Sequence, residues 1–227
     1  MNPPDWVNEA ARYILEEGLV NTLKIASIAL VGSTIVGVTL GTLLTINFLP
    51  LRALIRLYIE IWRGLPILVT IFIIFYALPA VTLSLRFEAL TAGAIALILW
   101  GSAQVAETTR GAIQSIPREQ HEAASALGFG WVGRHAFVIM PQALRRLLPP
   151  LVGLLVNIIQ NTTIVQVIGA SELLETAKRQ VERLTAPPPA GVGEIHSFEI
   201  YAAVMVIFFC ISFPLTRLSA YLEKRLQ

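Results

Sequence analysis

Residues 113–128 read Ile-Gln-Ser-Ile-Pro-Arg-Glu-Gln-His-Glu-Ala-Ala-Ser-Ala-Leu-Gly, a polar stretch between apolar segments around which the chain is organised. Pro117 suits the first turn of a helix, because a missing N–H costs nothing there. Glu119 and Glu122 place negative charge near the positive end of the helix dipole. Gly128 is a natural end point, since the residue after a helix often takes the left-handed conformation. The stretch predicts a short helix, a glycine corner and a second short helix that ends near Pro141.

Apolar runs flank this stretch on both sides and predict an all-α integral membrane protein. Of the 227 residues, 55% are hydrophobic and 14% are charged, which is too apolar for a soluble domain of this size. Four runs without a charged residue have at least 18 residues, enough to cross a hydrocarbon core of roughly 30 Å as helices. A fifth has 17 residues and can extend at its ends. The five runs are residues 25–49, 64–85, 89–106, 147–171 and 200–216.

Lysine and arginine counts in the connecting segments predict the orientation of these five spans. Eleven lie in residues 50–63, 107–146 and the tail from 217, whereas five lie in the alternate segments and Lys24 lies at a membrane edge. The positive-inside rule therefore places the N-terminus outside, and the C-terminus and residues 107–146 in the cytoplasm. Five spans, an odd number, likewise place the two termini on opposite sides of the membrane.

The first 21 residues and the single cysteine add smaller expectations. Asp5, Glu9 and Arg12 lie where a cleavable signal would have a basic start and an apolar middle, so an amphipathic lead-in at the surface is expected instead. Cys210 lies inside the last apolar run and has no cysteine partner in the chain. It is expected to pack as a small apolar side chain.

A second helix outside the spans is expected over residues 171–184. Ser171 suits its N-cap position. The three prolines at 187–189 then end it in an external loop before the last span. The whole chain, residues 1–227, is expected to form a single transmembrane domain without repeats.

Several motifs could be interpreted as functional sites but have ordinary structural explanations. Gly37 and Gly41 form a small-x3-small pair, for which close helix packing is the ordinary explanation. His121 and His135 have no cysteine or carboxylate group at metal-ligand spacing, so no metal site is expected. The spacing of the polar residues predicts no catalytic residue, and a net charge of +2 does not imply nucleic acid.

The fourth span carries three amides on one helix face. Asn157, Gln160 and Asn161 lie at i, i+3 and i+4. Amides within a bilayer face the protein interior or a wet cavity. Two interpretations stay open: the amides line a substrate path, or they form hydrogen bonds that hold helices or subunits together.

The spacing of Glu122-Ala123-Ala124, Gly128 and Val138-x-Met140-Pro141 resembles the Glu-Ala-Ala signature loop of ABC-transporter permease subunits. Where the family pattern prefers isoleucine and leucine, this chain has valine and methionine. In that family the loop forms the coupling helix that docks on the ATPase subunit. The resemblance therefore implies an ATPase-coupling role for Glu122, Ala123, Ala124 and Gly128.

The resemblance extends over almost the whole chain and narrows to one branch of the family. Residues 58–66, Tyr-Ile-Glu-Ile-Trp-Arg-Gly-Leu-Pro, look like a stretch of the polar amino acid permeases of the histidine/glutamine/glutamate/arginine type. Residues 110–117, 167–174 and 217–226 match that branch as well. Many members have Lys-Asp-Thr-Ser where this chain has Gln-Asn-Thr-Thr at 160–163, so the identity of the substrate does not carry over. Glu119 also replaces a frequent glycine.

By this resemblance, the protein is the five-span permease subunit of an ATP-driven importer of polar amino acids in the bacterial inner membrane, with a type I importer fold. Its implied partners are a second permease subunit, two ATP-binding cassette subunits and an extracytoplasmic substrate-binding protein. No covalent chemistry is expected on this chain, because ATP and Mg²⁺ belong to the partner. A secondary transporter would show inverted repeats, a channel would show a filter, and a membrane enzyme would show buried catalytic groups.

Overall fold

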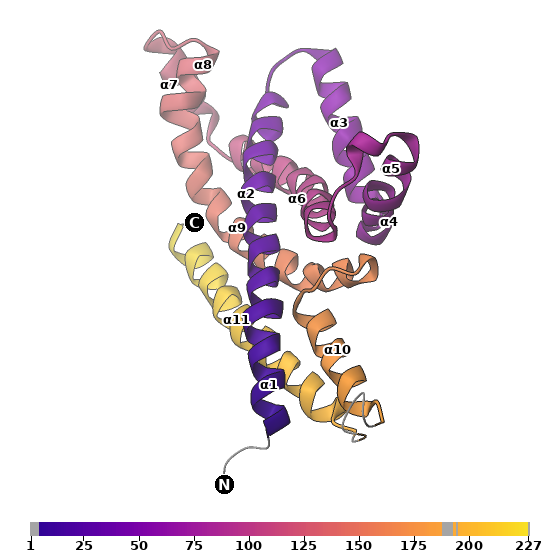
Figure 1. Cartoon of the computed structure of the whole chain (residues 1–227). Coiled ribbons are helices and arrows are strands. Elements are labelled where there is room, and N and C mark those ends of the chain that lie inside the picture. The colour runs from indigo at the N-terminus through magenta and orange to yellow at the C-terminus, as the bar shows by residue number, and fades with distance from the viewer. Residues whose placement is uncertain (1–4, 188–192, 194, 227) are drawn as a thin grey trace. The chain divides into compact units, whose positions relative to one another are not determined.

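The computed structural model describes residues 5–187, 193 and 195–226, and every regular element among them is a helix (Figure 1). Four helices are long and apolar enough to cross a membrane, and a fifth candidate is a pair joined by a bend. The prediction of an all-helical protein with several spans is confirmed, and the count is five when the pair is taken as one span. The single helices are Trp6–Leu43, Ala89–Gln114, Trp131–Ile168 and Ser197–Leu226, and the pair is Leu49–Gly64 with Ile67–Val81.

The chain divides into two compact units, and each is described separately. Unit 1 comprises Met1–Ala29, Pro66–Leu97 and Asn157–Pro214, and unit 2 comprises Leu30–Leu65, Ile98–Val156 and Leu215–Gln227. Four helices contribute residues to both units: α2 (Val20–Leu43), α6 (Ala89–Gln114), α9 (Met140–Asn161) and α11 (Ser197–Leu226).

In unit 1 the N-terminal helix packs on the helix that follows the fourth span. α1 (Asp5–Tyr13) and the π-helical η1 (Ile14–Leu19) continue directly into α2, so the amphipathic lead-in is an extension of the first span. Its apolar side meets α10 (Leu173–Thr185), and a Cβ on Gly18 would lie 3.0 Å from Leu173 Cα. The buried cluster between these helices and α11 consists of Ile14, Leu173, Ala177, Leu184, Ile200 and Val204.

The start of α10 differs from the prediction in its capping residue. The helix begins at Leu173, and its N-cap is Glu172 in place of Ser171. The Glu172 carboxyl group accepts hydrogen bonds from the N–H groups of Leu174 (2.9 Å) and Glu175 (2.8 Å). Ser171 Oγ instead accepts from Arg179 at 3.0 Å. A carboxyl group reaches the free N–H groups of a first turn as a hydroxyl does. Pro187 follows the helix, and Pro188 and Pro189 lie outside the described residues.

The burial of Glu172 predicts a loss of stability with rising pH. Its side chain is fully buried, and desolvation raises its pKa from 4.5 to about 7. Between these values the folded state binds the proton that the unfolded state has released, so the free energy of unfolding falls as pH rises. At about 1.4 kcal/mol for each pKa unit, the loss is on the order of 3 kcal/mol. Melting temperatures at pH 5 and pH 8 should differ less in Glu172→Gln than in the wild type. An unchanged difference would contradict this assignment.

The second apolar run, expected as one span over residues 64–85, forms a shorter helical unit. It contains α4 (Ile67–Phe72), the π-helical η2 (Ile73–Ala77), α5 (Leu78–Val81) and the 3₁₀ turn η3 (Leu83–Leu85). Leu65, with φ −79° and ψ 135°, is extended, because the residue before a proline avoids the helical region. Pro66 then stands at the N-cap of α4. The run therefore reaches full span length only together with α3 (Leu49–Gly64).

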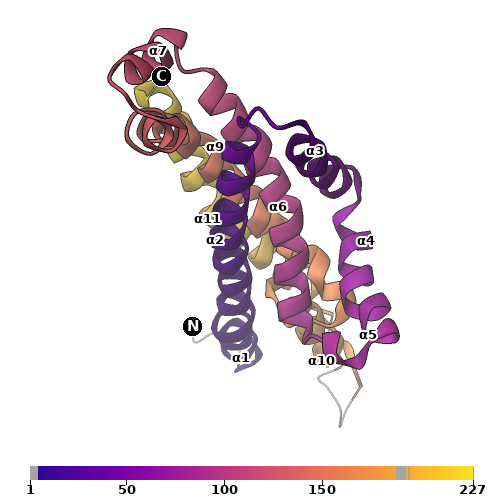
Figure 2. The ribbon, with the colours of Figure 1, turned by 90° about the horizontal axis from the view of Figure 1, so that it is seen from above.

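In unit 2 the second half of α2 lies along α6 (Figure 2), and the predicted glycine packing is confirmed. A Cβ on Gly37 would lie 2.7 Å from the Ser102 carbonyl oxygen. A Cβ on Gly41 would meet the Ala106 carbonyl oxygen and lie 2.6 Å from Thr109 Cβ. Only glycine lets these two helices approach so closely. The neighbouring α3 adds Ile55 and Ile59 to a buried cluster with Leu44 and Ala106.

The prediction of a second short helix ending near Pro141 is wrong. α8 (Trp131–Gly133), the π-helical η4 (Arg134–Ile139) and α9 follow one another without a break, and the 3₁₀ segment η5 (Thr162–Ile168) completes the helix. A π-helical segment just before Pro141 accommodates the missing N–H, as such insertions do in long helices. Pro149 and Pro150 also lie inside α9. The Pro149 carbonyl oxygen accepts a hydrogen bond from Ser219 Oγ at 2.8 Å.

The part of α11 that belongs to unit 1 has a largely exposed apolar surface. Met205, Val206 and Phe209 are all exposed, as expected for a helix that faces lipid or a second subunit. Cys210 lies on this surface and is exposed, so the expectation that it packs inside the chain is wrong. Sequence periodicity misses this because the run is apolar on every face.

Candidate functional site

The helix that carries the Glu-Ala-Ala motif is α7 (Arg118–Ala126), and a glycine cap ends it as predicted. Gly128 has a φ of +84°, and its N–H donates to the Ser125 carbonyl oxygen at 3.0 Å. The Phe129 N–H donates to the Ala124 carbonyl oxygen at 3.1 Å. These two bonds are the Schellman arrangement, which satisfies the last carbonyl groups of a helix. A Cβ on Gly128 would have no neighbour within 4 Å, so the backbone conformation alone demands glycine.

Three of the four predicted coupling residues lie at the surface. Ala124 is buried at 2% exposure, on the side of α7 that packs against η4. Glu122, Ala123 and Gly128 are exposed. Glu122 accepts a hydrogen bond from Arg118 Nε at 2.8 Å. The small side chain at position 123 leaves the outer side of α7 open to close approach by another protein.

Exposed apolar side chains continue this surface beyond the glycine corner. Leu127 is 78% exposed, Val132 72% and Phe137 73%. Polar groups of the same segment include Arg134, which donates a hydrogen bond to Ser125 Oγ at 2.9 Å. Apolar side chains with a polar rim are typical of a protein docking site. We call Glu122, Ala123, Leu127, Val132 and Phe137, all of them exposed, the candidate coupling surface.

A buried histidine ties this segment to the end of α2. His135 is 6% exposed, with its Nδ1 2.9 Å from the Trp131 carbonyl oxygen and its Nε2 3.1 Å from Thr45 Oγ1. Its ring centroid lies 6.5 Å from that of His121. The described residues contain no group of three His, Cys, Asp or Glu side chains able to hold a metal ion. His135 is thus a structural link, which sequence spacing could not indicate because Thr45 lies far away in the chain.

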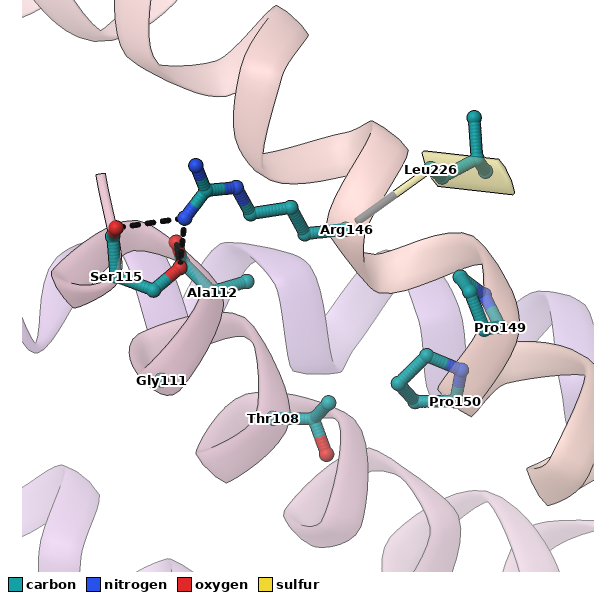
Figure 3. A pocket seen from close by; sticks show the side chains of 8 residues that line it. All are labelled: Thr108, Gly111, Ala112, Ser115, Arg146, Pro149, Pro150 and Leu226. Carbon is teal, nitrogen blue, oxygen red and sulfur yellow. Dashed lines mark hydrogen bonds between the residues drawn. The ribbon is translucent and has the colours of Figure 1, made fainter. Parts of the chain in front are cut away.

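A cavity of about 610 Å³ lies where α6, α9 and the end of α11 meet (Figure 3). Thr108 lines it from α6, Ser115 from the turn that follows α6, Pro149 and Pro150 from α9, and Leu226 from α11. Arg146 donates hydrogen bonds to the Ser115 carbonyl oxygen (2.6 Å) and to Ser115 Oγ (2.7 Å), which hold its charge at the cavity edge. In the sequence, Arg146 is one of the charges that predict orientation, and nothing in the neighbouring residues indicates its contact with Ser115.

The three amides of the fourth span occupy α9 in unit 1 and face mostly outward. Asn157 and Gln160 are exposed and Asn161 is half-buried. Asn161 Nδ2 donates to the Asn157 carbonyl oxygen at 2.8 Å. The side-chain amides of Asn157 and Gln160 have no hydrogen-bond partner among the described residues. They are therefore free to bind a ligand or a second subunit.

The charged pair near the end of α6 is internal to that helix. Arg110 donates to both carboxylate oxygens of Glu107, and its other terminal nitrogen donates to Gln114 Oε1 at 2.6 Å. The pair thus neutralises itself, which agrees with a structural role.

Comparison with known proteins agrees with this architecture. Residues 20–227 match the profile of a family described as binding-protein-dependent transport system inner membrane component. The glutamine transport system permease protein GlnP of Escherichia coli is 34% identical over 214 residues, which cover 94% of this chain and 93% of that protein. The probable glutamine ABC transporter permease protein GlnM of Bacillus subtilis is 31% identical over 211 residues, covering 93% and 92%.

Solved structures show the same fold. A crystal structure of an amino acid ABC transporter with histidines superposes with a TM-score of 0.81 at 26% identity, and covers 99% of this chain and 100% of that one. An inward-facing methionine ABC transporter superposes with a TM-score of 0.74 at 16% identity over 92% of this chain and 94% of that one. At that identity the second comparison shows the fold alone.

Proposed function

The chain belongs to the family of binding-protein-dependent transport system inner membrane components, and from this membership we propose how it works in an ABC importer of amino acids. It is a multi-pass permease subunit of the bacterial inner membrane, with the type I importer permease fold. Relatives at 31–34% identity over more than nine-tenths of the chain are glutamine permeases, which supports an amino acid as the transported substrate.

The structure of α7 is the main support for a coupling role. A glycine-capped helix presents Glu122 and Ala123 outward and is followed by exposed Leu127, as a docking helix for another protein requires. We propose that two ATP-binding cassette subunits bind here, on this chain and on a second permease subunit. Those subunits bind ATP with Mg²⁺ and hydrolyse it, and the permease performs no covalent chemistry. ATP can shift the permease between two states only by binding those states unequally.

The proposed assembly also includes an extracytoplasmic substrate-binding protein and a second permease subunit. The exposed apolar surface of α11 offers area for such a subunit. Within the assembly, residues 1–227 act as one transmembrane domain, and residues 107–146 form its cytoplasmic coupling segment.

The proposed orientation has the N-terminus outside and the C-terminus inside, and it predicts opposite labelling of two surface positions. In a Cys210→Ala background, Arg118→Cys should react with a membrane-impermeant maleimide only when the cytoplasmic face is open. Lys178→Cys should react only from the other face. Both positions are exposed on described helices, so access to solvent is assured. Labelling of position 178 from the cytoplasmic face would refute the orientation.

We propose that Asn157, Gln160 and Asn161 contact the passing amino acid. Neutral amides can hydrogen-bond both an α-amino and an α-carboxylate group without a fixed charge. Residues 147–171 contain no charged residue, which suits a substrate with an uncharged polar side chain or a broad range of substrates. The alternative is that the amides bind the second permease subunit.

Uptake by alanine variants separates these two roles. Asn157→Ala and Gln160→Ala should each lower the apparent affinity for substrate about 5- to 10-fold, the effect of one or two lost hydrogen bonds. Reconstituted vesicles with several amino acids would measure it, and Thr163→Ala, on the neighbouring turn, serves as the control. Unchanged uptake, or dissociation of the complex, would assign the amides to subunit packing.

A further inference from the structure

A basic pocket in unit 2 has no part in the function proposed so far. It encloses about 310 Å³ and lies between the end of α2, α3, the end of α6 and the segment from α7 to η4. Four arginines and two histidines line it, and no carboxylate does. These residues are Arg52, Arg56, Arg110, Arg134, His121 and His135.

One of the four arginines forms an ion pair among the described residues, and Arg56 also lies within electrostatic range of the same carboxylate, that of Glu107. Arg110 is paired with Glu107. Arg52, Arg56 and Arg134 form no ion pair with any described residue. The pKa of His121 lies below its ordinary value because the ring is partly desolvated and because Arg134 and His135 lie nearby. The pocket is thus a region of positive potential.

The same pocket contains buried donors without acceptors. Arg52 Nε, Trp131 Nε1 and Arg134 Nε are buried and have no hydrogen-bond partner in the described part of the chain. Nearly all buried N–H groups in proteins are paired, because an unpaired one costs free energy. All three residues line this one pocket, so an acceptor with negative charge would complement them. A phosphate group offers both, and arginine binds it with charge-assisted hydrogen bonds.

We propose that this pocket binds a phosphate group, supplied by the head of an anionic phospholipid. The two sides of α3 support the lipid source. Arg52 and Arg56, four residues apart, lie on one side and line the pocket. Leu54 and Leu57 are exposed apolar side chains of the same helix. A basic side and an apolar side on one helix place a lipid head group beside the arginines and its acyl chains beside the leucines.

Lipid binding to the full-length chain in detergent tests the proposal. Native mass spectrometry would compare the binding of phosphatidylglycerol and phosphatidylcholine to the wild type and to Arg52→Gln/Arg134→Gln. The double variant should lose about tenfold or more of its phosphatidylglycerol affinity, because two charge-assisted contacts are removed. Arg118→Gln/Arg145→Gln is the matched control. It removes the same charge from exposed arginines outside the pocket and should bind as the wild type does.

A conservative variant and a competition arm complete the test. Trp131→Phe keeps an aromatic ring but removes the N–H, and should weaken phosphatidylglycerol binding in the same direction without a change in melting temperature. Inorganic phosphate that displaces the lipid at equal concentration would show that the pocket takes free phosphate; no displacement would show that it needs the lipid. Equal lipid affinity of the two double variants would overturn the proposal. So would the absence of saturable binding of either probe, which would leave the pocket to water or to a partner's carboxylate.

Discussion

Gly41→Ala is expected to lower the yield of folded chain severely, although it adds a single methyl group. The new Cβ would meet the Ala106 carbonyl oxygen and lie 2.6 Å from Thr109 Cβ. A backbone oxygen inside α6 cannot rotate away as a flexible side chain can, so α2 and α6 must separate. Overpacking of this kind costs about 1–3 kcal/mol. The melting temperature in detergent and the monodisperse fraction after purification would measure the loss.

Gly111→Ala is the matched control for this substitution. Gly111 also lies inside a helix of unit 2, but a Cβ there would have no neighbour within 4 Å. Alanine raises helix propensity by about 1 kcal/mol at both positions. The difference between the two variants therefore isolates the contact of α2 with α6. Equal melting temperatures would mean that these helices do not need their close approach.

The helix contacts that sequence could predict are those with a periodic signature. The Gly37 and Gly41 pair is a spacing rule, and the structure shows the close contact that the rule implies. Gly128 is likewise a local signal, because the left-handed residue of a glycine cap depends on its own backbone. The apolar runs predicted the spans because their signal is also local in the sequence. Their length and composition are enough to indicate a membrane helix.

The predictions that proved wrong concern positions where contacts with neighbouring elements override the local sequence signal. Pro141 is a typical helix end, yet a π-helical segment before it lets the helix continue for 38 residues in all. Ser171 is a better capping residue than glutamate by propensity, but Arg179 binds its hydroxyl and Glu172 takes the cap. Arg146 and His135 bind Ser115 and Thr45, which are distant in the sequence. A single sequence holds no signal for such pairs.

Gly128→Val should abolish substrate-stimulated ATP hydrolysis by the assembled importer while the chain still inserts into the membrane. A β-branched residue tolerates a φ of +84° poorly, at a cost of about 1–2 kcal/mol or more. The turn at position 128 would change its conformation, and α7 would lose both cap hydrogen bonds. The exposed side of α7 would then no longer be held in position. Glu122→Lys should weaken coupling through a different cause, because it reverses a charge on the candidate coupling surface.

Gly130→Val separates strain from bulk in this experiment. Gly130 lies two residues further along with φ −66° and ψ 179°, a conformation that valine adopts readily, and it also has no neighbour within 4 Å. This variant should keep stimulated hydrolysis close to that of the wild type. If Gly128→Val were equally active, α7 would not need its glycine cap for coupling.

We propose that an ATPase subunit binds at α7 and the segment after it. The most direct measurement is site-specific cross-linking in native membranes, with a bifunctional reagent at Leu127→Cys in a Cys210→Ala background. Leu127 is exposed beside the glycine corner, whereas Lys178, used as the comparison position, lies on α10. We predict that position 127 captures an ATP-binding subunit and that Lys178→Cys does not. Capture of no ATPase at position 127, or equal capture at both positions, would mean that the ATPase subunit does not bind at α7.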